Sequence, residues 1–295
     1  MQFIRDIYAA KRAGNRPVIS FEFFPPKTAE GDRNLLEKQI PALIETRPDY
    51  CSVTYGAGGS TRDKTLMIVD RIQQQHGLTA LAHLTCVGHT REQVRDLLQK
   101  IRSLGCRNIL ALRGDPPGGA DFQTTPGGFE FAAQLVRFIR GAGDFSIGVA
   151  GFPEGHITCR DGKHVDWRHL KEKVDAGADF VLTQLFFDNA DFFAFRDFVA
   201  GSLGARVPLV PGIVPILSSG QITKFTQLCG AKIPPALRAR LDQLADDDEA
   251  ATQFGIEYAS RQCEELLRFG VPGLHFYTLN KARSTVQVLK NLGLA

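Results

Sequence analysis

A single carboxylate lies within one of the most apolar stretches of the chain, VISFEFFPPK at residues 18–27. Glu22 is flanked there by Phe21, Phe23 and Phe24. Burying an ionised carboxylate without a partner is costly, so the group must be paired, protonated or exposed at an edge. A carboxylic acid whose pKa is raised by apolar neighbours can hold a proton near neutral pH. We therefore expect Glu22 to be a partly buried acid at a strand end.

Polar side chains also follow other apolar runs of the sequence. They are Thr54, Tyr55, His83, Thr85, Arg113, Asp115, Glu154, His156, Gln184, Asp188, Tyr277, Thr278 and Asn280. In a barrel of parallel strands, the C-terminal strand ends meet at one mouth and form the active site. Each residue alone has a structural alternative: Glu22 could bond backbone N–H groups or Arg113, and His83 could be a core histidine. The convergence of so many polar strand ends on one mouth favours an active site there.

Three further polar residues share one face of an expected helix. Asp166, His169 and Lys173 lie at positions i, i+3 and i+7. One interpretation is a solvated helix start with Asp166 as its N-cap. The other is that this face turns toward a bound phosphate or ribose.

The elements that must position these residues alternate between strand and helix. Apolar runs predict strands at 18–24, 50–55, 78–86, 108–114, 146–152, 179–187, 207–214 and 273–279. Helical periodicity marks 91–105 and 190–200, and three extra helices are expected near 220–230, 234–245 and 248–269, between the seventh and eighth strands. This pattern predicts an α/β fold, a (β/α)8 TIM barrel, as a single domain over residues 1–295. The alternative, an open doubly wound sheet, needs a Gly-rich turn after the first strand, where the sequence reads FFPPKTAE.

Composition narrows the class of protein further. The net charge of the 295 residues is +3 and no Lys/Arg block occurs, which argues against a nucleic-acid partner. No apolar run approaches the roughly 20 residues that span a bilayer, and the N-terminus lacks a signal-peptide core. Six cysteines show neither C-x-x-C nor metal-ligand spacing. We therefore expect a cytoplasmic protein without structural disulfides, a bound metal or a membrane segment.

Several long blocks of the sequence are distinctive in combination. They are SFEFFPPK, SVTYGAGGSTRD, HLTC, ALRGDPP, FPEGH, LKEKVDAGADFVLTQLFFD, PGIVPI and HFYTLNKA, in this order. From about Val18 to Lys281, the chain closely resembles the methylenetetrahydrofolate reductase family, in its bacterial single-domain, flavin-dependent form. The regulatory domain of the animal enzymes has no counterpart in this sequence.

The resemblance implies FAD, NADH or NADPH as donor, and reduction of 5,10-methylenetetrahydrofolate to 5-methyltetrahydrofolate. It also implies a homo-oligomer, as in bacterial relatives. Glu22 matches the general acid, and Asp115 matches an aspartate placed against the flavin and the folate. The substrate-binding positions are Gln184, Gln221, Phe225 and Lys281. The flavin-site positions are Thr54, Tyr55, Ala57, His83, Arg113, Gly114, Asp115, Phe152, His156, Asp166, His169 and Lys173.

The sequence departs from the family pattern at several site positions. Phe152 stands where related bacterial enzymes often have Tyr, so a hydroxyl contact is lost while ring stacking can persist. His169 and Glu172 replace Asn and Arg, which removes one phosphate contact and leaves Lys173. Lys281 replaces an Arg near the folate and lacks its bidentate fork.

Two other functions remain compatible with the sequence. One is a flavin barrel subunit reduced by a partner electron-transfer protein. The other is a flavin reductase of a different cyclic aminal or imine. Anaerobic NADH or NADPH should bleach the flavin of the isolated reductase, whereas the partner-dependent subunit should stay oxidised.

Overall fold

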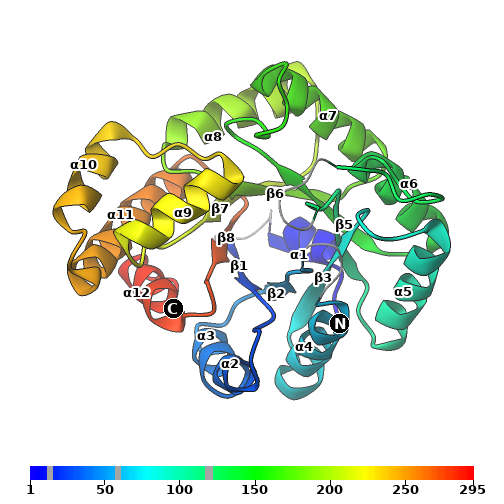
Figure 1. Ribbon diagram of the computed structural model, residues 1–295, viewed down its shortest axis with the longest axis horizontal. Coiled ribbons are helices and arrows are strands. Elements are labelled where there is room, and N and C mark those ends of the chain that lie inside the picture. Colours follow the sequence, from blue (N-terminus) through cyan, green and yellow to red (C-terminus); the bar gives the residue numbers. More distant parts are fainter. Residues whose placement is uncertain (12–15, 57–60, 117–121) are drawn as a thin grey trace.

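A computed structural model describes residues 1–11, 16–56, 61–116 and 122–295. Eight parallel strands, paired in chain order, close into a barrel (Figure 1). The strands are Val18–Phe23 (β1), Tyr50–Val53 (β2), Thr79–Thr85 (β3), Asn108–Leu112 (β4), Ser146–Gly151 (β5), Phe180–Leu185 (β6), Leu209–Ile213 (β7) and Gly273–Tyr277 (β8). Each lies within a range that the sequence predicted, so the (β/α)8 barrel is confirmed.

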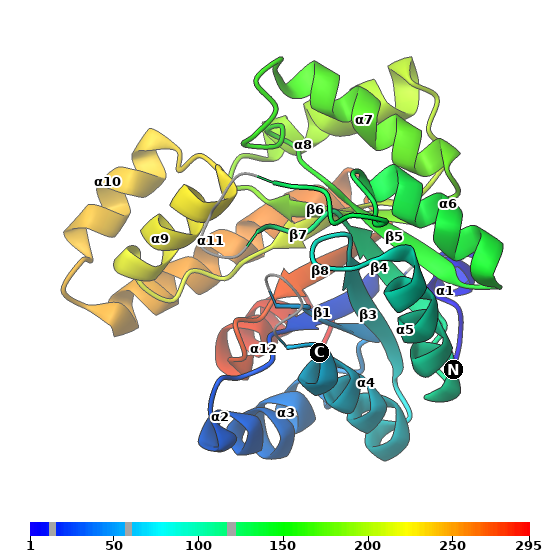
Figure 2. The ribbon, with the colours of Figure 1, turned by 45° about the vertical axis from the view of Figure 1, so that its right-hand side comes forward.

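Helices surround the barrel and cover its outer face (Figure 1). They are Ile4–Lys11 (α1), Ala29–Asn34 (α2), Ile40–Ile44 (α3), Arg62–His76 (α4), Arg91–Ser103 (α5), Ala132–Ala142 (α6), Lys163–Asp175 (α7), Asn189–Arg196 (α8), Ser219–Cys229 (α9), Pro235–Gln243 (α10), Asp248–Arg268 (α11) and Ala282–Asn291 (α12), with π-helical turns at Leu35–Gln39 and Asp197–Ser202. The helices α9, α10 and α11 confirm the predicted insertion between β7 and β8. Figure 2 shows α9 and α10 standing beside the barrel.

The period-two alternation of β1 divides its side chains between two environments. Ile19, Phe21 and Phe23 are fully buried in the large core between the sheet and the helices. Ser20 and Glu22 alternate with them and lie in the barrel interior, where they contact side chains of other strands. The apolar character of this stretch therefore serves the outer core and not the surroundings of Glu22.

The N-terminal end of the barrel is closed by α1. Ile4, Ile7 and Tyr8 pack against interior side chains, including Tyr50 and Phe180. The hydroxyl groups of Tyr8 and Tyr50 lie 3.0 Å apart and share a hydrogen bond. The contact of α1 with this end of the barrel is therefore mostly apolar.

The helices and the cysteines test two further sequence predictions, on membrane segments and on disulfides. Among the helices of the described ranges, none has both the length and the apolarity needed to cross a bilayer. All six cysteines are unpaired thiols, which confirms the absence of structural disulfides.

Candidate active site

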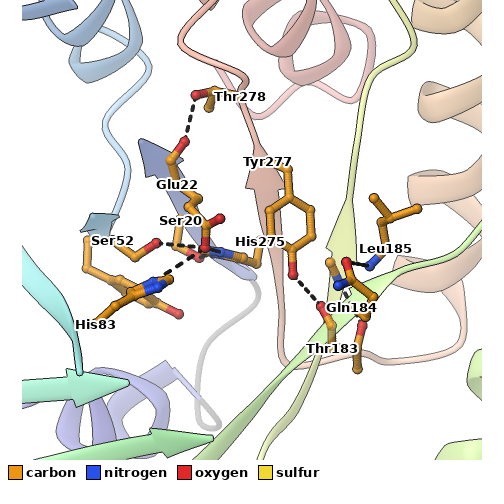
Figure 3. Close-up of polar contacts among 12 residues, drawn as sticks. Ser20, Glu22, Ser52, His83, Thr183, Gln184, Leu185, His275, Tyr277 and Thr278 are labelled. Carbon is orange, nitrogen blue, oxygen red and sulfur yellow. Dashed lines mark hydrogen bonds and ion pairs between the residues drawn. The ribbon is translucent and has the colours of Figure 1, made fainter. Parts of the chain in front are cut away.

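Glu22 lies in the barrel interior with only 6% of its surface exposed. Its Oε2 atom is 3.4 Å from Ser52 Oγ, 3.4 Å from His83 Nε2 and 3.4 Å from His275 Nε2 (Figure 3). The strand register explains this convergence, because β1 pairs with both β2 and β8 and sets Glu22 opposite Ser52 and Tyr277. Glu22 is therefore a paired carboxylate, held by three strands.

The electrostatics of this cluster correct one sequence prediction. Burial raises the pKa of Glu22, but the hydrogen bond with His275 and the nearby His83 outweigh burial, so the pKa lies below its ordinary value. The expectation of a raised pKa is wrong because Phe21 and Phe23 point to the outer core. Burial lowers the pKa of His83 to about 4, although Glu22 opposes the effect. His83 is thus neutral at physiological pH.

Several polar residues of the interior were not found from the sequence. Ser20 Oγ lies 2.8 Å from His275 Nδ1, and His275 is fully buried. Tyr277 lies at the end of its strand, as the sequence predicted, and its hydroxyl donates to the Thr183 carbonyl at 2.6 Å (Figure 3). Residues two apart in a strand share one face of the sheet. Ser20 precedes Glu22 by two residues and His275 precedes Tyr277 by two, so this alternation could have placed both in the interior.

A second group of polar residues lies where β5 meets α7. Lys173 donates from Nζ to the Ala150 carbonyl at 2.6 Å. Burial lowers the pKa of Lys173 to about 8, and burial raises the pKa of Asp166 against the opposing charges of Lys173 and His156. The helix starts at Lys163 with Gly162 as its N-cap, so the interpretation of Asp166 as an N-cap is wrong.

Aromatic rings and further charges complete this second group. The rings of Phe152 and His156 meet edge to face, with centroids 4.5 Å apart. Lys173 Nζ lies 5.8 Å from the Phe152 centroid. The positive charge of Arg113 acts on both His156 and Lys173. The structure thus brings these residues together with Asp166, whereas His169 is exposed on the same helix.

The loop after β4 approaches the end of β3 closely at Gly114. Gly114 has φ +81°, and a Cβ atom there would lie 2.8 Å from Thr85 Cβ. Only glycine fits this left-handed, crowded position without strain. The loop therefore carries Arg113 and Asp115 past Thr85, whose buried Oγ1 has no hydrogen-bond partner in the described ranges. Asp115 is exposed at the mouth.

The predicted cofactor residues after β2 are only partly described. Thr54 and Tyr55 are partly buried at the end of that strand. The Tyr55 hydroxyl and His89 Nε2 are 3.1 Å apart. Ala57 lies outside the described residues.

Three of the four predicted substrate residues lie on or next to α9. Gln184 lies at the end of β6, and its Oε1 accepts from the Leu185 amide at 2.8 Å. A small pocket is lined by Gln184, by Phe152 and by the C-terminus of α9. Gln221 and Phe225 lie one turn apart on α9 and are both partly buried. Lys281 is exposed just before α12.

The fold and this mouth define a class of protein. An eight-stranded barrel whose C-terminal mouth holds a buried carboxylate and a cluster of charged groups is typical of a barrel enzyme. The family model described as methylenetetrahydrofolate reductase matches residues 7–293. The chain therefore belongs to the methylenetetrahydrofolate reductase family, which confirms the resemblance seen in the sequence.

Individual relatives agree with this assignment. The chain is 42% identical over 305 residues to "Methylenetetrahydrofolate reductase (NADH) 1" of Zea mays, covering 100% of this chain and 51% of the plant protein. It thus spans about half the length of the plant relatives. It is 38% identical over 278 residues to the "5,10-methylenetetrahydrofolate reductase" of Pectobacterium carotovorum, covering 94% of this chain and 90% of that protein.

Solved structures support the fold. An uncharacterized protein from Clostridium thermocellum, described as binding two copies of 5-methyl-5,6,7,8-tetrahydrofolic acid, superposes with a TM-score of 0.67 at 16% identity. The match covers 96% of this chain and 97% of that one. At this identity the likeness is evidence for the barrel alone.

Proposed function

We propose that this protein reduces 5,10-methylenetetrahydrofolate to 5-methyltetrahydrofolate, with FAD as cofactor and NADH or NADPH as hydride donor. The observation that carries the proposal is the buried Glu22 cluster at the barrel mouth of a chain belonging to this reductase family. The plant relatives carry NADH in their names, which favours NADH over NADPH.

The residues opposite Glu22 fit an anionic dinucleotide. Arg113, His156 and Lys173 supply donors for a pyrophosphate, and burial lowers the pKa of Lys173 although the charge of Asp166 opposes the effect. The Gly114 backbone passes close to Thr85, whose buried Oγ1 has no hydrogen-bond partner in the part of the chain that the structure describes. Thr54, Tyr55, Phe152 and Asp166 would border the same cofactor. When bound there, FAD would supply the hydride-transfer chemistry of the reaction.

The residues of this chain have separate tasks in that reaction. The folate substrate carries a five-membered ring that bridges two nitrogens, and the ring must open to an iminium cation before hydride can add. Glu22 delivers the proton that the departing nitrogen needs. Asp115 favours the developing cation. Two carboxylates in different environments thus perform acid and electrostatic roles.

Residues around α9 bind and orient the folate in this proposal. Gln184 and Gln221 offer amide hydrogen bonds to its polar edge, and Phe225 offers a stacking face. Lys281 lies at the rim and attracts an acidic tail. Because Phe225 would stack on either planar ligand, nicotinamide and folate alternate in one pocket and the kinetics are ping-pong.

A two-step anaerobic experiment tests the proposal. The purified protein should be yellow and release FAD on denaturation. NADH or NADPH should bleach the flavin of the isolated protein, and methylenetetrahydrofolate should then restore its colour with formation of 5-methyltetrahydrofolate. Comparing the two nicotinamides in stopped flow gives the donor preference.

The same experiment separates the alternatives. Bound flavin that neither nicotinamide reduces would favour the subunit served by an electron-transfer protein. Reduced flavin that the folate does not reoxidise would favour another cyclic aminal or imine. The unpaired cysteines fit a reducing cytoplasm, and we propose a homo-oligomer, which sedimentation would test.

A further inference from the structure

Two ring side chains from neighbouring loops meet beside the predicted cofactor residues. Tyr55 follows β2 and His89 follows β3, and these two strands pair in the barrel. The Tyr55 hydroxyl lies 3.1 Å from His89 Nε2, and the ring centroids are 5.7 Å apart. His89 is only 3% exposed. It has no task in the proposed reaction, although it contacts a residue that would border the cofactor.

A backbone carbonyl fixes which ring nitrogen of His89 carries the proton. His89 Nδ1 lies 2.9 Å from the Val87 carbonyl oxygen, and a carbonyl can only accept. Turning the ring over would place a carbon at that distance, which is shorter than a C–H···O contact of about 3.3–3.6 Å. Nδ1 therefore carries a proton and donates it to Val87. In a neutral ring, Nε2 then has only a lone pair, so the Tyr55 hydroxyl must donate to it.

Both side chains are uncharged at neutral pH. Burial lowers the pKa of His89 and outweighs the Val87 and Thr85 carbonyls, which favour the charged ring. The positive charge of Arg62 acts in the same direction as burial. Burial also raises the pKa of Tyr55 to about 12, although Arg62 opposes the effect. The phenol thus keeps its one proton, and the neutral imidazole receives it in a hydrogen bond.

The backbone is held in place on both sides of this contact. Next to Tyr55, the Thr54 carbonyl accepts from Thr65 Oγ1 of α4 at 2.7 Å. Gly128, in the loop after β4, lies so close to the His89 carbonyl oxygen that a Cβ atom would be 2.4 Å from it. Because neither backbone segment can shift without disturbing these contacts, the bond between the two rings determines where the phenol hydroxyl points.

We propose that His89 is a positioning residue of the FAD site, which makes the Tyr55 hydroxyl an obligate hydrogen-bond acceptor toward the cofactor. A phenol has one proton and two lone pairs, and His89 takes the proton. The hydroxyl can therefore receive a hydrogen bond from an O–H or N–H group of FAD, but it cannot donate to a phosphate or carbonyl oxygen. The inference rests on the proposed function and deepens its cofactor site.

This assignment divides the recognition of FAD between two kinds of side chain. Arg113 and Lys173 bring only donors, which suit the pyrophosphate oxygens. Tyr55 brings an acceptor, which suits the hydroxyl groups of the ribose and ribityl chains or the imide N–H of the flavin ring. A phenol whose proton is free could donate to phosphate as well. His89 thus keeps Tyr55 from pairing with the pyrophosphate.

Nitrogen NMR of histidine-labelled protein tests the tautomer, in the apoprotein and after FAD is added. His89→Gln assigns the His89 signals among the seven histidines. We expect a protonated Nδ1 and a bare Nε2 in both samples at neutral pH. Tyr55→Phe should move the Nε2 signal toward that of a nitrogen without a hydrogen bond and leave Nδ1 unchanged. A protonated Nε2 in the native protein, or an Nε2 signal that does not respond to Tyr55→Phe, would overturn the proposal.

The affinity for FAD tests the positioning role. His89→Leu removes the acceptor of the phenol proton, so FAD affinity should fall about 2- to 12-fold, the usual net contribution of one hydrogen bond. His89→Gln should restore most of the affinity, because its carbonyl oxygen can accept the same proton. In the Tyr55→Phe background, His89→Leu should cause no further loss. Losses that multiply in the double variant would mean that His89 acts without Tyr55, and the positioning role would be wrong.

Phosphate-free fragments of the cofactor locate the donor group. Riboflavin and adenosine are each titrated as competitors of FAD, in the native protein and in Tyr55→Phe. Weaker binding of riboflavin to the variant places the donor on the flavin or its ribityl chain, and weaker binding of adenosine places it on the ribose. Either result supports the acceptor role. If FAD binds more weakly to the variant but neither fragment does, Tyr55 contacts a phosphate and the proposal is wrong.

The proposed function and this inference fail in distinguishable ways. If the native protein binds no FAD, the proposed function is wrong and the positioning role falls with it, whatever the tautomer. If nicotinamide reduces bound FAD while native His89 has a protonated Nε2, the function stands and the inference alone is wrong. Should His89→Leu not fold, Tyr55→Phe and the native spectra still decide between these results.

Discussion

The two sides of the barrel mouth differ in how deeply their polar side chains are buried. On the side of β1, β3 and β8, the side chains of Glu22, His83 and His275 are at most 8% exposed and converge on one oxygen. On the side of β4, β5 and α7, Arg113 and His156 are partly exposed and Asp115 is exposed. We call the first the proton side, because its buried groups suit proton transfer. We call the second the cofactor side, because its exposed charges can pair with a ligand.

This difference follows from which elements supply the residues. The proton side is formed by hydrogen-bonded strands in fixed register, where neighbours cannot move independently. The cofactor side is formed by a helix and by loops after strands, where a glycine such as Gly114 permits close approach. A substitution on the proton side should therefore alter one chemical step, and one on the cofactor side should alter binding.

The largest expected effect comes from Glu22→Gln, which keeps size and polarity but removes the proton. Folate reduction should fall by about 10²- to 10⁴-fold, the usual contribution of a positioned acid. Reduction of the bound flavin by NADH needs no proton from Glu22 and should remain nearly unchanged. Stopped-flow measurement of the two half-reactions checks this prediction.

Asp115→Asn provides the matched comparison from the cofactor side. It removes a charge next to both ligands, so both half-reactions should change. If Glu22→Gln slows both half-reactions equally, Glu22 is a structural carboxylate and the contrast between the two sides disappears.

The sequence predicted the elements better than the contacts within the site. Eight apolar runs were enough to locate every strand, and the strand-end rule placed Glu22, Gln184 and Asp115 at one mouth. The contact between Glu22 and His275 could not be read from spacing, because it depends on β8 closing the barrel against β1. Local composition predicted the wrong sign for the pKa of Glu22, since its apolar neighbours in sequence are not its neighbours in space.

The next effect concerns FAD retention. Lys173→Ala removes a cation that we expect to bind phosphate, and a charge-assisted hydrogen bond contributes about 1.5–3 kcal/mol. FAD affinity should fall about 10- to 150-fold, whereas the free energy of unfolding should change little, because the apoprotein loses the hydrogen bond to the Ala150 carbonyl but also the penalty for burying the charge. Equilibrium dialysis of the flavin measures this.

Lys171→Ala is the control on the same helix. Lys171 forms an ion pair with Asp175 on the outer face of α7, with Lys171 Nζ 2.6 Å from Asp175 Oδ1. Its removal should leave FAD affinity unchanged. Equal losses in the two variants would show that α7 contributes only general stability, so the cofactor side would need another phosphate ligand.

A smaller effect is expected on α9, at the border between the two sides. Phe225→Ala removes the ring proposed to stack on both nicotinamide and folate, so each half-reaction should slow about three- to tenfold. Leu228→Ala is the control, because Leu228 is 71% exposed on the same helix. Loss of only one half-reaction, or a ternary complex with both ligands bound, would contradict a shared pocket.

The smallest effect is a pH dependence of stability that comes from Lys173 on the cofactor side. In the cofactor-free protein, burial lowers the pKa of Lys173 from 10.5 to about 8. Between these values the unfolded chain binds more protons than the folded one at this residue. Its contribution to the free energy of unfolding therefore rises with pH over this range, and the penalty for burying the charge is complete below pH 8.

Urea unfolding of the apoprotein from pH 7.5 to 9.5, compared with Lys173→Met, should show a steeper rise of the free energy of unfolding in the native chain. Bound FAD should remove the difference, because a phosphate partner restores the ordinary pKa. Identical slopes in the two apoproteins would mean that the Lys173 charge is already compensated, and the cofactor side would then hold no uncompensated charge at this residue.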